Sequence, residues 1–258
     1  MKATDLAASL YEIAKTKKTV YAWGMFGSVI TKSTIEGKAK QYPSWYTENR
    51  LQSVFSPLYG SNPPVWGFDC IGLIKGVLWG WQGVTDKSYG GAVYASNSVP
   101  DLSADAMISK CSNVSTDFSN IAVGEYLWMK GHCGIYVGNG LAVESSPKWS
   151  NGVQITACNC SKQGYNTRYW TKHGKLPYIA YEKGENNTVM VELSVLKKGS
   201  KGEEVKTLQR LLNAFGYNLS VDGDFGSKTQ SALRSYQKSN SLEVDGICGT
   251  NSWNSLLK

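Results

Sequence analysis

Two side chains suited to nucleophilic catalysis, Cys70 and His132, stand far apart in the sequence. A cysteine thiolate attacks carbonyl carbons, and an imidazole near its own pKa can pass a proton to a leaving amine. Glu144, a little after His132, could fix the tautomer of that imidazole. The sequence therefore offers Cys70, His132 and Glu144 as candidate nucleophile, base and orienting residue.

The position of Cys70 favours its ionised form. After Asp69-Cys70, large apolar residues recur at three- and four-residue steps as far as Trp81, which predicts a helix lying on a core. Cys70 would lie in the first turn, where free backbone N–H groups and the helix dipole stabilise a thiolate. Asp69 is the expected N-cap. Without a partner elsewhere in the chain, the same cysteine would fit an inert buried position equally well.

The segment around Gly138-Asn139-Gly140 joins two β-rich runs and has the signature of a hairpin. With a three-residue loop, Glu144 lies opposite Gly134 and has His132 as its diagonal neighbour on the same face. A two-residue loop would turn Glu144 to the other face, as an ordinary edge-strand carboxylate. His173, the only other histidine, lies in a polar turn and is the alternative base.

The remaining elements predict an α+β fold. Residues 4–18 have helical apolar spacing, and residues 123–128, 152–156 and 175–179 have the composition of strands. One early helix followed by an antiparallel sheet is an α+β pattern. Residues 25–66 are rich in aromatic residues, serine, glycine and proline, and predict a long irregular excursion that could wall a groove.

Composition and charge limit the classes of partner. The 258 residues, 41% of them hydrophobic, suffice for one large or two smaller cores. The formal net charge of +7 suggests a polyanion: nucleic acid, an anionic membrane or a bacterial wall polymer. No basic block interleaved with aromatic residues occurs, which argues against nucleic acid. No run is long and apolar enough for membrane insertion.

The six cysteines lack the spacing of a disulfide framework, and we expect them to be reduced. Cys158 and Cys160, with Cys133 and a histidine, could in principle hold zinc. Their spacing is not that of a zinc knuckle or ribbon. We therefore expect no metal and no cofactor.

The C-terminal part contains an internal repeat. Two Asp-Gly turns, at Asp222 and Asp245, are each followed by Ser or Thr in an N-cap position and then by helical apolar spacing. Ser227 with Gln230 fits a capping box. Together with a helix at residues 203–215, the repeat predicts a small three-helix unit.

A polar, glycine-containing stretch separates this unit from the rest of the chain. We expect a catalytic domain at residues 1–181, a linker at 182–192 and the three-helix domain at 193–258.

The catalytic segments resemble those of a known family. Phe-Asp-Cys-Ile-Gly-Leu-Ile, Gly-His-Cys-Gly-Ile-Tyr-Val-Gly-Asn-Gly and Ala-Val-Glu-Ser are similar to the cysteine and histidine motifs of the NlpC-type bacterial cell-wall peptidases, a papain-like family. The resemblance covers about residues 4–181. It implies a papain-like domain with Cys70 as nucleophile, His132 as base and Glu144 as third residue, where the family often has histidine.

The same resemblance places Tyr21, the first residue of Tyr-Ala-Trp-Gly, near the oxyanion. This chain departs from the family in having Ile71 after the cysteine and a long segment at residues 24–68, so Tyr42 or Tyr46 could replace Tyr21. Aromatic residues could line the groove or belong to the core. The candidate substrate-binding residues are Asp69, Trp23, Trp149, Trp170 and His173.

The C-terminal unit is similar to the three-helix peptidoglycan-binding module, through its Gly-Glu-Glu-Val-Lys-Thr-Leu-Gln-Arg-Leu-Leu start and both Asp-Gly-x-x-Gly turns. The aspartates could bind the wall or only stabilise their turns. The candidate wall-binding residues are Asp222, Asp224, Phe225 and Asp245.

These resemblances imply a peptidoglycan hydrolase of the endolysin or autolysin kind, which cleaves a stem-peptide amide after γ-D-glutamate through a thioester at Cys70. The alternatives are an N-acetylmuramoyl-L-alanine amidase with the same residues and a wall-binding protein without turnover. Asp5 and Glu12 interrupt every apolar run that could serve as a secretory signal. We therefore expect synthesis in the cytoplasm, release with a holin-like helper, and action on the wall.

Overall fold

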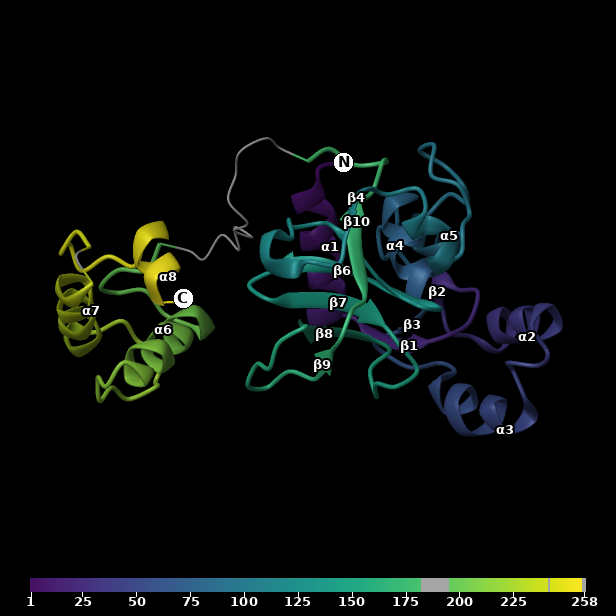
Figure 1. Ribbon diagram of the computed structural model, residues 1–258. Helices are drawn as coiled ribbons and strands as arrows, with labels where there is room; N and C mark the ends of the chain where they lie inside the picture. The colour runs from purple at the N-terminus through teal and green to yellow at the C-terminus, as the bar shows by residue number, and fades with distance from the viewer. Residues whose placement is uncertain (182–194, 241, 257–258) are drawn as a thin grey trace. The chain divides into compact units, whose positions relative to one another are not determined.

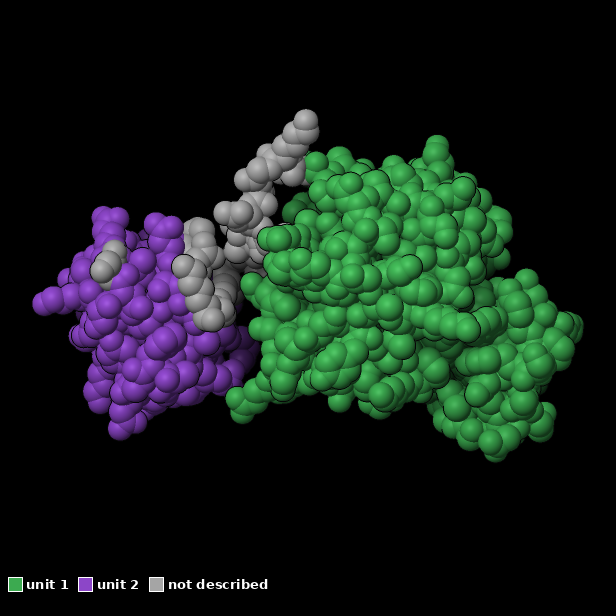
Figure 2. Space-filling view, in the orientation of Figure 1, with its two compact units in different colours: residues 1–189 green, residues 190–258 purple. Residues whose placement is uncertain are grey.

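Figure 1 shows the chain in a computed structural model that describes residues 1–181, 195–240 and 242–256. It divides into two compact units, Met1–Val189 and Met190–Lys258, which Figure 2 colours separately. The linker predicted at 182–192 lies outside the described residues. Among the described residues, no helix combines the length and the apolar composition that crossing a bilayer requires.

The first unit mixes helices with two sheets, as its α+β pattern predicts. The larger sheet has seven strands in the order β4-β10-β5-β6-β7-β8-β9, antiparallel except where β9 joins β8. Its strands are β4 (Ser112–Ser115), β5 (Tyr126–Met129), β6 (His132–Gly138), β7 (Leu141–Ser145), β8 (Val153–Cys158), β9 (Thr167–Arg168) and β10 (Lys172–Lys175). The smaller sheet has the order β1-β3-β2, with β1 parallel to β3 and β2 antiparallel to it. Its strands are β1 (Lys18–Tyr21), β2 (Phe26–Val29) and β3 (Val65–Phe68).

Two helices build the core of this unit with the larger sheet. Helix α1 (Ala3–Thr16) confirms the helix predicted at the N-terminal end, and α4 (Cys70–Leu78) confirms the one predicted after Asp69. Every residue of α4 is buried, because the helix packs against β2, β6 and α1. The other helices and helical turns are α2 (Lys32–Gln41), α3 (Glu48–Arg50), α5 (Ala104–Ile108), the π-helical η1 (Leu51–Phe55), and the 3-10 turns η2 (Ser56–Leu58), η3 (Ser88–Gly91) and η4 (Phe118–Asn120).

The segment at residues 25–66 is not the irregular excursion that its composition predicts. It contains β2, α2, α3 and two further helical turns. Only one residue of α2, Ile35, is buried, so the helix has no apolar stripe for a periodicity argument to find. A capping box between Thr31 and Thr34 marks where this helix begins. The strand predicted at 175–179 is also displaced, since β10 consists of the polar residues before it.

The hairpin between β6 and β7 has the predicted register. Gly134 lies opposite Glu144, and Met129 on β5 lies opposite His132. Residues 138–140 all have positive φ, which glycine and asparagine adopt at low cost. Gly138 pairs with Leu141, so the turn itself has two residues, and a shift of register between Tyr136 and Gly138 restores the parity of the predicted three-residue loop. Glu144 therefore lies on the same face as the histidine at the start of β6.

The second unit consists of the three predicted helices, α6 (Glu203–Ala214), α7 (Ser227–Ser239) and α8 (Thr250–Leu256). Its small core is formed by apolar residues from all three helices and from the turns between them. The prediction of a capping box at Ser227 and Gln230 is wrong, because the N-cap of α7 is Gly226, which has no side-chain cap, and Ser227 is already the first residue of the helix. The largest buried members of this core are Leu208, Leu212, Phe225, Leu233, Tyr236 and Trp253.

Candidate functional site

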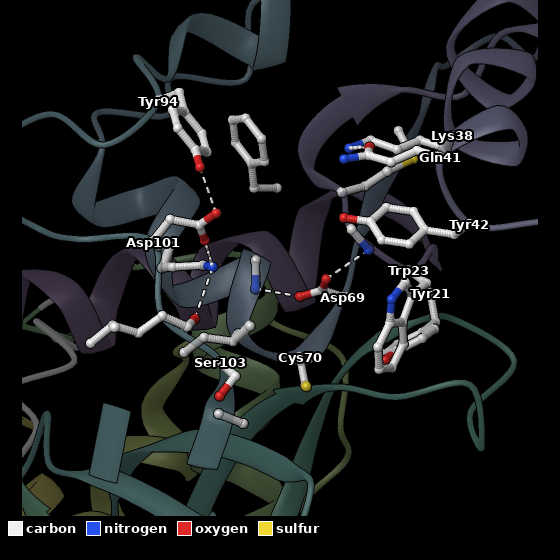
Figure 3. A pocket seen from close by; sticks show the side chains of 18 of the residues that line it. Tyr21, Trp23, Lys38, Gln41, Tyr42, Asp69, Cys70, Tyr94, Asp101 and Ser103 are labelled. Carbon is white, nitrogen blue, oxygen red and sulfur yellow. Dashed lines mark hydrogen bonds and ion pairs between the residues drawn. The ribbon is translucent and has the colours of Figure 1, made fainter. Parts of the chain in front are cut away.

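Cys70 is the first residue of α4 and lines an open pocket of the first unit (Figure 3). The N-cap is Asp69, whose carboxylate accepts hydrogen bonds from the backbone N–H groups of Gly72 and, at 2.8 Å, Gly24. Only 6% of Cys70 is exposed. Cys70 is therefore largely shielded from water but still lines the pocket.

The surroundings of Cys70 favour its thiolate. A hydrogen bond from Cys133 is the largest factor that lowers the pKa of the Cys70 thiol. Burial raises this pKa, whereas the hydrogen bond and the charge of His132 lower it further. Together with the backbone N–H of Ile71, these contacts lower the pKa of Cys70 to about 5. The thiolate is consequently the dominant form at neutral pH.

His132 connects the thiol to the carboxylate. Its Nε2 lies 2.7 Å from Oε2 of Glu144, which leaves Nδ1 for the hydrogen bond with Cys70. Burial works to lower the pKa of the imidazole, but the hydrogen bonds to Cys70 and Glu144 outweigh it and raise the pKa above its ordinary value. The indole of Trp170 stacks on the ring at 5.5 Å between centroids, with an angle of 9° between the planes. The structure thus brings the three candidate catalytic residues together.

Glu144 is completely buried and fully hydrogen-bonded. Thr156 donates to Oε1 at 3.0 Å, and the guanidinium of Arg168 donates to both oxygens, with Nη2 2.6 Å from Oε2. Burial favours the neutral acid, yet the hydrogen bonds from His132 and Arg168 prevail and lower the pKa of Glu144. The carboxylate therefore stays ionised beside the imidazole.

Arg168 is the main residue that the sequence did not reveal. It lies on β9 beside β8, and its guanidinium lies 5.2 Å from the centre of the Trp149 ring. The signal was only indirect: a buried glutamate requires a cation, but nothing in the spacing selects this arginine from the other basic residues.

The pocket above Cys70 has a volume of about 560 Å³. Its wall comes from the turn after β1, from α2, from the start of α4 and from the segment that leads into α5. The side chains labelled in Figure 3 are Tyr21, Trp23, Lys38, Gln41, Tyr42, Asp69, Cys70, Tyr94, Asp101 and Ser103.

Tyr21 lies beside the thiol and lines the same pocket. It hydrogen-bonds with Cys70, and burial followed by the charge of Cys70 raises the pKa of its hydroxyl, so the group remains a donor. Tyr42 lines the pocket further out, against Gly24. Tyr46 is buried and donates to the carbonyl of Trp23 at 2.9 Å, outside the pocket lining. Of the three candidates for an oxyanion donor, Tyr21 has the best position.

The predicted substrate-binding residues divide into two groups. Asp69 and Trp23 line the pocket, and Trp23 is 44% exposed. Trp149, Trp170 and His173 do not line it. Trp149 and Trp170 instead pack on Arg168 and on His132, beside the candidate catalytic residues.

His173 is buried on β10, opposite Leu127 of β5. Its Nδ1 pairs with Glu125, and its Nε2 donates to the carbonyl of Asp117 at 2.8 Å. Both ring nitrogens are therefore occupied by structural partners. The alternative base is not placed beside the thiol.

Among the described residues, no three His, Cys, Asp or Glu side chains lie close enough together to hold a metal ion. Burial and the neighbouring Cys160 raise the pKa of Cys158 to about 12, which keeps its thiol protonated. The zinc alternative for Cys133, Cys158 and Cys160 therefore has no geometric support.

In the second unit, the repeat consists of two equivalent turns, each held by a buried glutamine. Gln209 donates to Asp222 at 2.8 Å, and Gln237 donates to Asp245 at 2.8 Å. Each glutamine oxygen also accepts the N–H of the following glycine. The carboxylates of Asp222 and Asp245 thus have internal partners that stabilise the turns.

The two other predicted wall-binding residues differ in exposure. Phe225 is fully buried in the core of the second unit, so its ring is not presented to a polymer. Asp224 is exposed and lies 3.4 Å from the ammonium of Lys201. Asp222 and Asp245 are exposed as well, so Phe225 alone of the four is withdrawn into the core.

One protein family matches part of this second unit. Residues 201–256 match the protein family described as "Putative peptidoglycan binding domain". The N-acetylmuramoyl-L-alanine amidase CwlL of Bacillus licheniformis is 41% identical over 59 residues, 22% of this chain and 16% of that protein. The N-acetylmuramoyl-L-alanine amidase CwlM of Mycobacterium tuberculosis is 48% identical over 56 residues, 21% of this chain and 14% of that protein.

Among solved structures, a Burkholderia AP3 phage endolysin is 38% identical, with 24% of each chain covered and a TM-score of 0.24. The chain spans 14–16% of the length of the two amidases, and its homology to cell-wall hydrolases runs through the binding domain alone. The second unit of this chain is a peptidoglycan-binding domain.

Proposed function

We propose that the first unit is a papain-like cysteine hydrolase that cleaves an amide of the peptidoglycan stem peptide, after γ-D-glutamate, while the second unit holds the enzyme on the wall. One observation carries the proposal. Cys70 lies at the start of a helix and at an open pocket, in hydrogen-bonding contact with His132, whose other nitrogen bonds Glu144. This arrangement has the parts that acyl transfer from an amide requires.

The reaction follows from these contacts in two steps. The Cys70 thiolate attacks the carbonyl carbon of the amide and forms a C–S bond. The imidazolium of His132 then gives its proton to the amide nitrogen, the C–N bond breaks, and the amine leaves. Neutral His132 next takes a proton from water, which attacks the thioester; the C–S bond breaks and yields the carboxylic acid and the regenerated ion pair.

The negative oxygen that develops in each step needs hydrogen-bond donors. We assign this role to the backbone N–H of Cys70 at the start of α4 and to the hydroxyl of Tyr21, which contacts the thiol. Glu144 keeps the imidazole in the orientation that serves both proton transfers. Arg168 in turn keeps Glu144 ionised.

The substrate class is supported by the second unit. A peptidoglycan-binding domain in the same chain raises the local concentration of wall peptides around the pocket. The net charge of +7 suits an anionic wall. Two relatives that match this chain over 56–59 residues are named N-acetylmuramoyl-L-alanine amidases, which supports wall hydrolysis as the activity class.

Purified sacculi provide the test. We expect the full chain to release new amines, Cys70→Ala to release none, and Cys111→Ala to release as many as the unaltered protein. Cys111 is a suitable control because burial raises the pKa of its thiol to about 12. Sedimentation of the chain with sacculi but no release of amines would instead support a wall-binding protein without turnover.

The identity of the new amine separates the two hydrolases. Cleavage after γ-D-glutamate frees the amine of the third stem residue, whereas an N-acetylmuramoyl-L-alanine amidase frees the amine of L-alanine. Release that survives Cys70→Ala and disappears with a chelator would contradict a cysteine mechanism.

A further inference from the structure

Lys38 brings to the pocket a positive charge that the catalytic steps do not use. It lies on α2 and lines the pocket with Gln41, also of that helix (Figure 3). Its ammonium donates to Oε1 of Gln41 at 3.2 Å and lies 5.7 Å from the centre of the Tyr42 ring. Among the residues that the structure describes, Lys38 has no ion-pair partner.

The carboxylates on the facing side of the pocket already have partners. Both oxygens of Asp69 accept backbone N–H groups. Asp101 is paired with the ammonium of Lys75 and accepts the hydroxyl of Tyr94 at 2.6 Å. Neither carboxylate is therefore available as a direct counter-ion for Lys38.

The protonation of Lys38 reflects this position. Burial lowers the pKa of its ammonium, and the more distant charges of Asp69 and Asp101 act against this lowering. An ammonium that has lost part of its hydration gains more from a direct anionic contact than one in water does. The pocket wall thus contains a cation that a bound anion would stabilise.

Gln41 completes the site with a second donor. A lysine ammonium can only donate hydrogen bonds, so the amide oxygen of Gln41 must be the atom that faces Lys38. This fixes the amide and leaves its NH₂ group as a donor beside the ammonium. A carboxylate, with two acceptor oxygens and a negative charge, matches this pair of donors.

We propose that Lys38 and Gln41 form a subsite for a free carboxylate of the stem peptide. The inference rests on the proposed function, because the peptide reaches α2 only when it occupies the pocket above Cys70. A D-glutamyl residue linked through its side chain carries a free α-carboxylate next to the cleaved amide. The pocket would therefore select peptides with this carboxylate over peptides in which it is a primary amide.

Two synthetic stem tetrapeptides that differ only in this group, free carboxylate or primary amide, test the subsite. Their binding is measured by calorimetry with the full chain carrying Cys70→Ala, so that no turnover occurs. We expect the carboxylate peptide to bind about 10-fold more tightly, as for loss of one charge-assisted hydrogen bond. In the same background, Lys38→Met should abolish the difference and Lys38→Arg should keep most of it.

Lys40→Met is the matched control, since Lys40 is exposed on the same helix and lies outside the pocket lining. It removes the same charge and should leave the preference unchanged. Equal binding of the two peptides, binding of neither, or an equal loss for both peptides in Lys38→Met would overturn the subsite. Hydrolysis of both peptides by the chain with Cys70 intact is measured in parallel. Equal kcat/KM for the two peptides would support the hydrolase and reject the subsite. Tight, selective binding of the carboxylate peptide without hydrolysis would support the subsite and reject the hydrolase.

Discussion

Nη2 of Arg168 lies 2.6 Å from Oε2 of Glu144, in an ion pair whose carboxylate is completely buried. The same carboxylate oxygen lies 2.7 Å from Nε2 of His132. A buried acid would normally be neutral, and a neutral acid would not stabilise an imidazolium. Arg168 therefore makes a glutamate usable at this position, and the resting site contains a thiolate, an imidazolium and a carboxylate.

Replacing Arg168 by methionine should lower kcat/KM on the order of 100-fold, because Glu144 would lose its charge partner and become protonated. Adding Arg168→Met to a Glu144→Gln chain should cost little further activity, since a neutral amide has no charge for Arg168 to maintain. Activity on stem peptides and thermal unfolding are measured for Arg168→Met, for Glu144→Gln and for the double variant. A double variant whose loss equals the sum of the two single losses, in free energy, would show that Arg168 acts otherwise.

The pH dependence of kcat/KM should be bell-shaped. The thiolate of Cys70 forms as the pH rises through about 5, so activity should rise there. The pKa of His132 is raised above 6.5, so the imidazolium that protonates the leaving amine is lost only above that pH, and activity should fall there. Initial rates on one stem peptide between pH 4 and 10 measure both limbs. An acidic limb near the ordinary pKa of a thiol would contradict the ion pair.

Cys133 should set the acidity of Cys70. It is fully buried, and its hydrogen bond is the largest factor that lowers the pKa of the Cys70 thiol. Cys133→Ala removes this donor, so the pKa of Cys70 should rise from about 5. The rate of alkylation of Cys70, followed against pH by peptide mass spectrometry, measures the change. Cys111→Ala should leave the midpoint in place, and an unchanged midpoint in Cys133→Ala would refute the role of that hydrogen bond.

The aspartates of the repeat should act on stability. Gln237→Ala would leave Asp245 and the N–H of Gly246 without their partner and should lower the free energy of unfolding of the second unit by about 2 kcal/mol. Asp224→Ala, an exposed position, should change it by less than about 0.5 kcal/mol. Urea unfolding followed by hydrogen exchange in residues 195–256 measures both. Loss of sacculus binding in Asp245→Asn with unchanged stability would instead assign that carboxylate to the wall.

The sequence could predict contacts between residues that one element or one hairpin relates. Helical spacing placed Cys70 at a helix start, and the assumption of a three-residue hairpin loop placed Glu144 beside His132. The structure reaches the same register through a two-residue turn and a shift of register in β6. Both arguments need only local geometry. The contact between the hairpin and the helix is a tertiary one, and only the resemblance of the motifs to a known family predicted it.

The parts that the sequence missed lack any such local relation. Arg168 reaches Glu144 from β9, on the far side of β8, and no spacing rule connects the two. Lys38 lies on a helix with a single buried residue, which an apolar pattern does not detect. The sequence likewise does not predict that His173 pairs with Glu125 or that Asp245 accepts from Gln237, because several other polar residues could have been their partners.

The mass of the protein during turnover tests the role of Cys70 most directly. The full chain is mixed with a stem peptide, quenched in acid within milliseconds to seconds, and examined by mass spectrometry before and after treatment with hydroxylamine. We expect an adduct with the mass of the acyl fragment, located on Cys70 and removed by hydroxylamine as a thioester is. An adduct on another residue, or undiminished cleavage by Cys70→Ala, would contradict the proposed nucleophile.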